Sequence, residues 1–244
     1  MGFWNLARVP EPEEMDDAGE VESYSSAAAA RHLDRIDETF VQHLLGLLES
    51  TLRVGGRRGW GLDIGTGPAQ IPINILRKVP GLAIVGIDRS RNMLAEARRK
   101  SIAAGVSERL ILMLADGHSL PFGDARFAVV MSNSVLHHAR DPVALLKEMA
   151  RVAQPGAALL VRDLRRPSRL ALPWHLWRYG RHYEGLMRKL FKDSVRAAYR
   201  IEELEAFIRA SKVAGLAPFR FRGAHVGIER PQSVSRSRRW MKRV

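Results

Sequence analysis

Between residues 61 and 162, short apolar runs alternate with amphipathic stretches, and this alternation limits the fold more than any other feature of the sequence. Buried strands are predicted for five apolar runs, at residues 61–64, 82–88, 110–115, 127–132 and 157–162. Helices are predicted between them over residues 70–79, 91–104 and 141–152. Because parallel strands are joined by crossover helices, the pattern predicts an α/β fold with a doubly wound parallel sheet.

The predicted domain extends to both sides of this alternating block. Apolar residues at three- and four-residue steps predict a helix over residues 27–52, and a helix at 201–214 precedes two final strands at 217–222 and 225–229. A helical insert at 167–192, rich in aromatic and basic residues, interrupts the rhythm before those strands. The chain is therefore expected to divide into an acidic N-terminal arm (1–25), a folded domain (26–230) and a basic C-terminal tail (231–244).

Charge is distributed unevenly along the 244 residues, whose net charge is +13. Residues 1–50 hold three basic and eleven acidic residues, so they carry −8 and the remainder carries +21. Nine basic and two acidic residues fall within 162–192. This excess predicts an anionic partner, such as nucleic acid, an acidic small molecule or a peripheral anionic surface contacted by the insert and tail.

The composition also excludes several classes of protein. Cysteine is absent, which removes disulfide scaffolds, thiolate metal sites and cysteine nucleophiles. No apolar run approaches the roughly eighteen residues of a membrane helix, and the acidic start does not suit a signal peptide. We therefore expect a soluble, cytoplasmic protein without a transmembrane segment.

In doubly wound sheets, ligands bind beyond the carboxyl ends of the strands. The polar residues at these ends are Asp63, Asp88, Asp116, Asn133 and Asp163. Gln70 stands where a dinucleotide-binding loop has its last glycine, and Asp63 would repel a pyrophosphate but attract an ammonium group. Asp88 follows Gly65 by 23 residues, about the distance expected for a carboxylate that binds ribose hydroxyls. These positions predict a ligand with a ribose and a cation but no phosphate.

Four segments in register strengthen this prediction: residues 62–67, 85–88, 114–117 and 149–157. Their motifs and order resemble the class I S-adenosylmethionine-dependent methyltransferases, most closely the branch of ubiquinone and menaquinone C-methyltransferases. The resemblance spans about residues 59–163. It implies a Rossmann-like, seven-stranded, mostly parallel sheet in three α/β/α layers with an antiparallel final strand. It also implies S-adenosyl-L-methionine as cofactor and S-adenosyl-L-homocysteine as product.

The resemblance assigns roles residue by residue. The methionine end of the cofactor would contact Asp63, Gly65, Gly67 and the backbone at Asn133, the ribose would contact Asp88, and the adenine would contact Asp116 and Gly117. One departure is visible, since Ala69 stands where the family has a third glycine. Taken singly, each acid could instead cap a helix or close a turn.

Candidate catalytic residues follow the fourth predicted strand. His137 and His138 could each accept a proton near neutral pH, and we favour His138 as a general base, although one ring could pack while the other faces water. No ligand cluster predicts a metal site.

The aromatic side chains predicted to bind the acceptor are Tyr24, Trp174, Trp177, Tyr179 and Tyr183. Those of the insert could equally belong to an amphipathic helix that packs on the core.

Three functions therefore stay open. The first is a methyltransferase for a small molecule of anionic or amphipathic character. The second is an RNA or nucleic-acid methyltransferase, although residues 132–137 lack the Asn/Asp-Pro-Pro-aromatic motif that stacks a flipped base. The third is a catalytically inactive, cofactor-binding partner protein, for which a broken glycine loop or a missing ribose carboxylate would be the mark. The glycine loop and the ribose carboxylate are both intact here.

Overall fold

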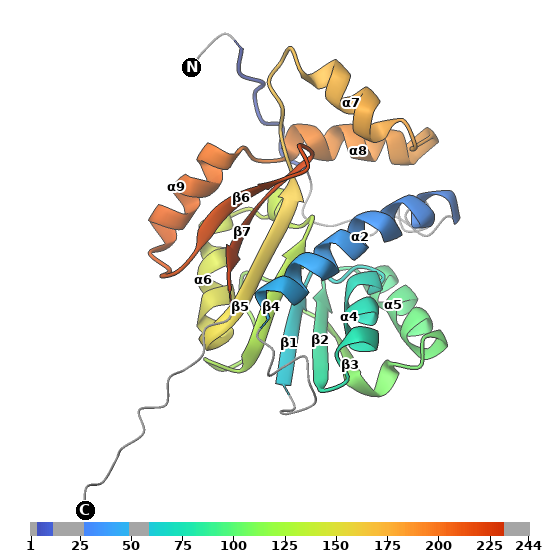
Figure 1. The fold of residues 1–244 in the computed structure, drawn as a ribbon, viewed down its shortest axis with the longest axis vertical. Coiled ribbons are helices and arrows are strands. Elements are labelled where there is room, and N and C mark those ends of the chain that lie inside the picture. Colours follow the sequence, from blue (N-terminus) through green and yellow to red (C-terminus); the bar gives the residue numbers. More distant parts are fainter. Residues whose placement is uncertain (1–3, 12–26, 49–58, 232–244) are drawn as a thin grey trace, which may run out of the picture.

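The structure is a computed structural model that describes residues 4–11, 27–48 and 59–231. Seven strands form one sheet in the order β3-β2-β1-β4-β5-β7-β6 (Figure 1). Their bounds are β1 (Gly59–Ile64), β2 (Leu82–Asp88), β3 (Leu110–Leu114), β4 (Phe127–Asn133), β5 (Ala153–Leu164), β6 (Ala217–Phe221) and β7 (His225–Arg230). Strands β1 to β5 are parallel, and β7 runs antiparallel to both of its neighbours. The predicted seven-stranded, mostly parallel α/β sheet is confirmed.

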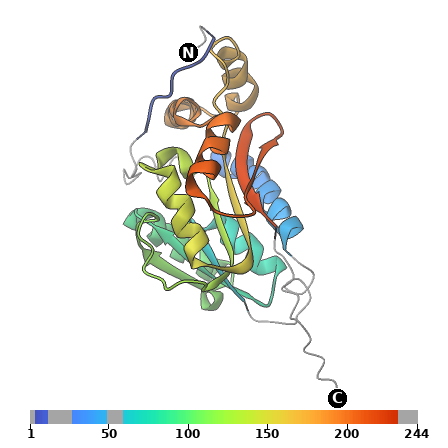
Figure 2. The ribbon, with the colours of Figure 1, turned by 90° about the vertical axis from the view of Figure 1, so that its left-hand side faces the viewer.

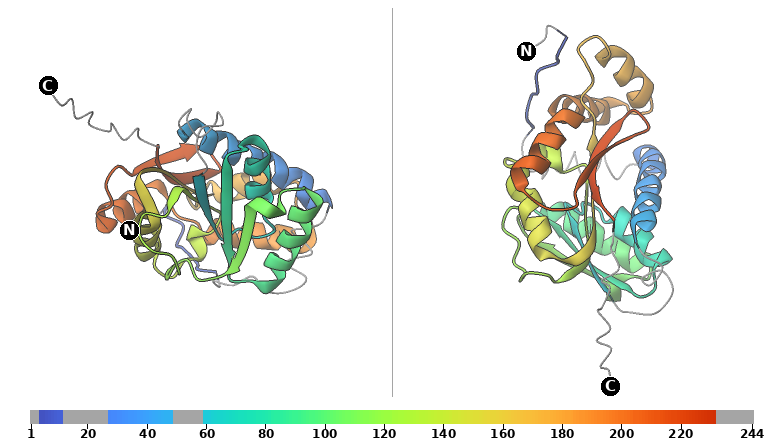
Figure 3. Two further views of the ribbon diagram at one scale, coloured as in Figure 1. Left: turned by 90° about the horizontal axis from the view of Figure 1, so that it is seen from below. Right: turned by 60° about the vertical axis from the view of Figure 1, so that its left-hand side comes forward.

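Helices cover both faces of the sheet and complete the three layers (Figures 2 and 3). One layer contains α2 (Ala27–Leu47), α4 (Gln70–Lys78) and α5 (Arg91–Ala103), and the other contains α6 (Pro142–Val152) and α9 (Ile201–Ser211). Alternate residues of β5 serve the two cores, since Leu160 packs in the cluster of α2 and α4 and Leu159 in the cluster of α6 and α9. None of the helices that the structure describes has both the length and the apolar character needed to cross a membrane.

Local chemistry explains where these helices begin and end. The Ser90 hydroxyl accepts a hydrogen bond from the Met93 amide at 3.1 Å, which caps α5 as predicted. Helix α9 ends three residues before the predicted boundary because Lys212 adopts a left-handed conformation (φ 56°) that closes it. The predicted helix over residues 27–52 ends at Leu47, and residues 49–58 lie outside the described part of the chain.

The insert folds into α7 (Leu172–Gly180) and α8 (Gly185–Ala197), which lie beyond the carboxyl ends of the central strands (Figure 1). We refer to residues 165–197 as the cap. Residues 4–11, the N-terminal strap, run beside it: the Val9 amide donates to the Arg196 carbonyl at 3.1 Å, and Arg200 donates to the Asn5 side chain at 2.6 Å. The cap and the strap thus enclose the end of the sheet where ligands are expected.

Candidate active site

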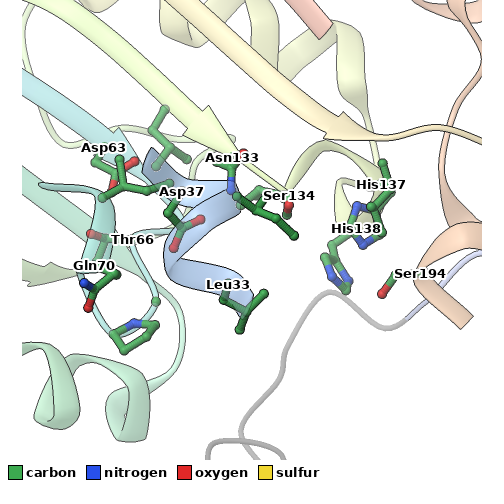
Figure 4. Close-up of a pocket in the computed structure, with 18 of the residues that line it drawn as sticks. Leu33, Asp37, Asp63, Thr66, Gln70, Asn133, Ser134, His137, His138 and Ser194 are labelled. Carbon is green, nitrogen blue, oxygen red and sulfur yellow. The ribbon is translucent and has the colours of Figure 1, made fainter. Parts of the chain in front are cut away.

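A cavity of about 510 Å³ follows the carboxyl ends of the strands. It begins at Asp116 and Gly117, passes the glycine loop after β1, and ends between the short helix η2 (Leu136–His138), the cap and the β6–β7 hairpin. All seven residues predicted to contact the cofactor line it, as do both candidate catalytic histidines. Figure 4 shows the middle of this cavity, where Asp63, Asp37 and Asn133 lie close together.

The glycine loop has the backbone geometry that a close ligand requires. Gly65 adopts φ +69°, and a Cβ there would collide with Val135. Gly67 adopts φ +50°, and a Cβ there would meet nothing within 4 Å, which leaves open space beside its backbone. Ala69 is also left-handed (φ 62°), and its methyl group is fully buried. The substitution of the family's third glycine therefore keeps the turn, at a strain of roughly 1–2 kcal/mol.

Two carboxylates are fixed at the strand ends by backbone amides. Asp88 accepts hydrogen bonds from the amides of Gly67 at 2.8 Å and Ser90 at 2.9 Å. Asp116 accepts from the His118 amide at 2.8 Å, and its Oδ1 lies 3.0 Å from His118 Nδ1. Burial opposes ionisation of Asp116, but the hydrogen bonds from His118 outweigh it and lower its pKa. Asp116 therefore faces the cavity as an anion.

A second carboxylate pair lies at the middle of the cavity. Burial, assisted by the nearby Asp88 and Asp37 and opposed by a hydrogen bond from Thr66, raises the pKa of Asp63 to about 7. The pKa of Asp37, on α2, is also raised to about 7, mainly by desolvation. The sequence analysis missed Asp37. The signal that could have found it is its position between Leu33 and Phe40, on the core-facing side of an amphipathic helix. Two acids with raised pKa values favour a cationic ligand between them.

Arg162 organises this part of the site and was also missed by the sequence analysis. Its guanidinium is fully buried and donates to the side chains of Asn133 at 3.0 Å and Thr39 at 2.8 Å. It also lies over the ring of Phe40 at 5.0 Å. Burial lowers its pKa to about 10, so it stays charged near neutral pH. Arg162 thereby fixes α2 and the side chain of Asn133 relative to β5.

The two candidate catalytic histidines begin the second half of the cavity. His137 is 2% exposed, its amide donates to Asp163 at 2.8 Å, and its Nδ1 lies 2.6 Å from the same carboxylate. Desolvation would lower the pKa of His137, but the nearby carboxylates of Asp163 and Glu11 raise it to about 9. The pKa of Asp163 is lowered, since His137 outweighs the effect of burial. The two side chains therefore form a buried ion pair at neutral pH.

Glu11 of the strap closes this corner. Its Oε2 lies 3.4 Å from His137 Nε2 and 3.8 Å from His138 Nε2. The ring of His138 is tilted by 37° to that of His137, with 4.1 Å between centroids (Figure 4). Arg8 holds the strap in place, donating to the carbonyls of His137 and Ala197 at 2.6 Å each. The side-chain atoms of Glu11, His137 and His138 that could bind a metal ion lie within 4.8 Å of one another. The sequence analysis did not find this cluster.

The predicted aromatic acceptor residues separate into three groups. Tyr179 and Tyr183 line the cavity, and the Tyr179 hydroxyl donates to the Arg222 carbonyl at 3.0 Å. Trp174 and Trp177 do not reach it, because α7 turns them outward, where they are 55% and 60% exposed. Tyr24 lies outside the described residues.

Further residues that sequence reasoning missed complete the acceptor end of the cavity: Met187, Phe191, Phe221, Ala224 and His225. Burial lowers the pKa of His225 to about 3, so its ring is neutral. This end of the cavity therefore combines an apolar wall with the polar corner at His137.

Comparisons with known proteins agree with this architecture. Residues 62–161 match the family model described as a methyltransferase domain. An uncharacterised methyltransferase of Schizosaccharomyces pombe is 29% identical over 151 residues, which cover 60% of this chain and 51% of that protein. The ubiquinone/menaquinone biosynthesis C-methyltransferase UbiE of Desulfotalea psychrophila is 31% identical over 169 residues, which cover 68% of this chain and 65% of that protein.

A solved S-adenosylmethionine-dependent methyltransferase from Aquifex aeolicus has the same fold, with a TM-score of 0.62 at 16% identity over 89% of this chain and 99% of that one. The chain thus spans half of the first curated relative and somewhat under two thirds of the second. Family match, relatives and sheet order lead to one assignment: residues 62–161 form a methyltransferase domain, and the sheet has the fold of S-adenosylmethionine-dependent methyltransferases.

Proposed function

We propose that the protein methylates a small amphipathic or anionic molecule that binds at the acceptor end of the cavity, beside His137. The observation that carries this proposal is the buried His137–Asp163 pair: the His137 ring lines the cavity, and its Nδ1 lies 2.6 Å from the Asp163 carboxylate behind it. The UbiE relative acts, by its name, in ubiquinone and menaquinone biosynthesis, which supports a small-molecule acceptor.

The other end of the cavity fits the cofactor. Gly67 leaves open space beside the loop, and Asp88 stands at the end of β2 with backbone amides fixing its orientation. Asp63 and Asp37 provide the negative charge that an ammonium group needs, and Asp88 can accept from two ribose hydroxyls. Asp116 and Gly117 also line this end of the cavity, and we assign the adenine to them. When bound, S-adenosylmethionine supplies a methyl group activated by its attachment to a positively charged sulfur.

His137 is proposed to hold the acceptor as an anion. With a pKa raised to about 9, its ring is an imidazolium near neutral pH, and its Nε2 faces the Glu11 carboxylate at 3.4 Å. Nε2 makes no hydrogen bond to this carboxylate, so an acceptor oxygen that replaced it could accept a charge-assisted hydrogen bond from the ring. Asp163 fixes the ring and its charge, as a carboxylate orients the histidine of a catalytic pair.

His138 is then the candidate general base. Its ring packs beside His137 and is partly exposed, so a proton taken from an acceptor hydroxyl or acidic C–H can pass to solvent. The apolar wall formed by Met187, Phe191 and the two tyrosines favours a flat acceptor over a strongly hydrated one.

Transfer of labelled methyl groups tests the proposal. The protein is incubated with methyl-labelled S-adenosylmethionine and a series of phenols and hydroquinones with increasing alkyl chain length, and separately with bulk RNA. We expect label in the organic extract, with His137→Phe reducing it about a hundredfold or more. Label in acid-precipitated RNA would support the nucleic-acid hypothesis instead, and cofactor binding without transfer to any acceptor would support the inactive partner.

A further inference from the structure

The cap exposes several large apolar side chains and several basic ones. We call the surface that they form the cap face. Trp174 and Trp177 lie three residues apart and share one side of α7, and Leu170 lies in the turn just before this helix. Trp174, Trp177 and Leu170 are 55%, 60% and 69% exposed, and Leu186 at the start of α8 is 39% exposed. Exposed apolar residues gathered in this way mark an interaction site more often than a solvated surface.

Exposed cations lie on both cap helices and beside them. The exposed basic residues of the cap face are Arg169, Arg178, Arg181, Arg188, Lys189 and Lys192. None of these six forms an ion pair with a residue that the structure describes. Elsewhere Arg151, Arg99 and Lys78 are each paired with a carboxylate of the chain. The charge of the cap face is therefore available to an external anion.

The cap face also lies next to the entrance of the acceptor end. Arg178 is exposed on this face and lines the cavity, and Arg181 lies over the Trp177 ring at 5.9 Å. The strap adds Trp4, which is 60% exposed and whose carbonyl accepts from the Arg169 amide at 3.1 Å. In Figure 1, α7 lies at the far end of the molecule, above α2, α4 and α5.

We propose that the cap face docks on a bilayer that contains anionic phospholipids, with the tryptophans at the level of the headgroups and the cations on the lipid phosphates. Tryptophan prefers the membrane interface because its ring is apolar and its N–H is polar. A short helix with an apolar stripe and basic flanks lies in the plane of that interface. Docking in this orientation would open the acceptor end toward the lipid, so the proposed acceptor would be an amphiphile drawn from the bilayer. This last step rests on the proposed function, but the docking itself does not.

Co-sedimentation with vesicles tests the docking without any methyl transfer. The full chain is mixed with vesicles of phosphatidylcholine alone or with phosphatidylglycerol added, and bulk RNA and inorganic phosphate are added as competitors. We expect binding only to the anionic vesicles and weaker binding as salt rises. Because each cation near an anionic bilayer contributes about fivefold to partitioning, Arg181→Gln/Arg188→Gln should weaken binding roughly thirtyfold.

Two matched controls keep the test specific. Arg77→Gln/Arg98→Gln removes the same charge from the α4 and α5 side, and Trp60→Ala removes a tryptophan that is 45% exposed at the opposite end of β1. Both should leave vesicle binding unchanged, whereas Trp174→Ala/Trp177→Ala should weaken it about tenfold. Thermal stabilisation by S-adenosylhomocysteine should be the same in all variants, which shows that they fold. The proposal would be overturned if the cap variants and the control variants bound vesicles equally well. Binding to neutral vesicles alone, or binding to RNA without any binding to vesicles, would overturn it too.

Discussion

The cofactor end of the cavity is made mostly from one continuous stretch of chain, with Asp37 added from α2 and Asn133 from β4, whereas the acceptor end is assembled from four separate segments. Residues 63–117 supply the loop and the carboxylates that would bind the cofactor. The strap, η2, the cap and the β6–β7 hairpin meet at the other end, through hydrogen bonds such as that between Arg8 and His137, 129 residues apart. The first end depends on local turn geometry and the second on tertiary contacts, so substitutions at the two ends should affect different properties.

The largest effect is expected at the acceptor end, from Asp163→Ala. This change leaves the His137 imidazolium buried without its partner, which should lower the free energy of unfolding by about 3–5 kcal/mol. Denaturant unfolding measures it. The double variant Asp163→Leu/His137→Phe removes both charges and should recover most of the loss, and a double variant as unstable as the sum of the two single variants would contradict the buried ion pair.

The next largest effect is expected at the cofactor end, from Asp88→Ala. Removing two charge-assisted hydrogen bonds to the ribose should weaken S-adenosylhomocysteine binding about a hundredfold. Isothermal titration calorimetry measures the affinity, and Asp124→Ala, at an exposed carboxylate paired with Arg151, serves as the control. Equal affinities for the two variants would remove Asp88 from the ribose site.

A smaller effect is expected at the middle of the cavity, where the affinity for the cofactor should depend on pH. Because Asp63 and Asp37 have pKa values near 7 in the free protein, they must lose protons when a cation binds between them. Affinity for S-adenosylmethionine should therefore fall as pH drops below 7, by up to tenfold per pH unit for each group. Titrations in buffers of different ionisation enthalpy should show proton release, and Asp37→Asn should reduce it. Affinity independent of pH between 6 and 8 would contradict the paired carboxylates.

The smallest effect concerns the strap. Glu11→Gln removes one of the two anions beside His137, so the pKa of that ring should fall from about 9 but stay above its usual value because Asp163 remains. The raised pKa contributes stability that is present below pH 6.5 and is lost as pH rises toward 9, so the variant should lose about 1 kcal/mol or less at pH 6. Histidine NMR titration measures the shift, with His225 as an internal reference. An unchanged midpoint would show that the strap does not contact His137 in solution.

The same contrast explains what sequence alone could predict. The strands and helices from β1 to β5 follow from periodicity, capping and turn residues, and most predicted boundaries fall within a few residues of those observed. Strand β5 begins four residues early because Ala153 pairs with Phe127 across a register shift. The residues predicted to bind the cofactor lie in local motifs, and all of them line the cavity. Asp37, Arg162 and Glu11 were not, because their roles depend on contacts such as that between Arg162 and Thr39, 123 residues apart, which no local pattern shows.

The most direct test is a calorimetric titration of S-adenosylhomocysteine into the wild-type protein, Asp88→Ala and His137→Phe. If the two ends of the cavity are separate, the wild type binds one equivalent, Asp88→Ala loses about a hundredfold in affinity, and His137→Phe binds as tightly as the wild type. No binding by the wild type, or a loss in His137→Phe equal to that in Asp88→Ala, would contradict the assignment of the two ends.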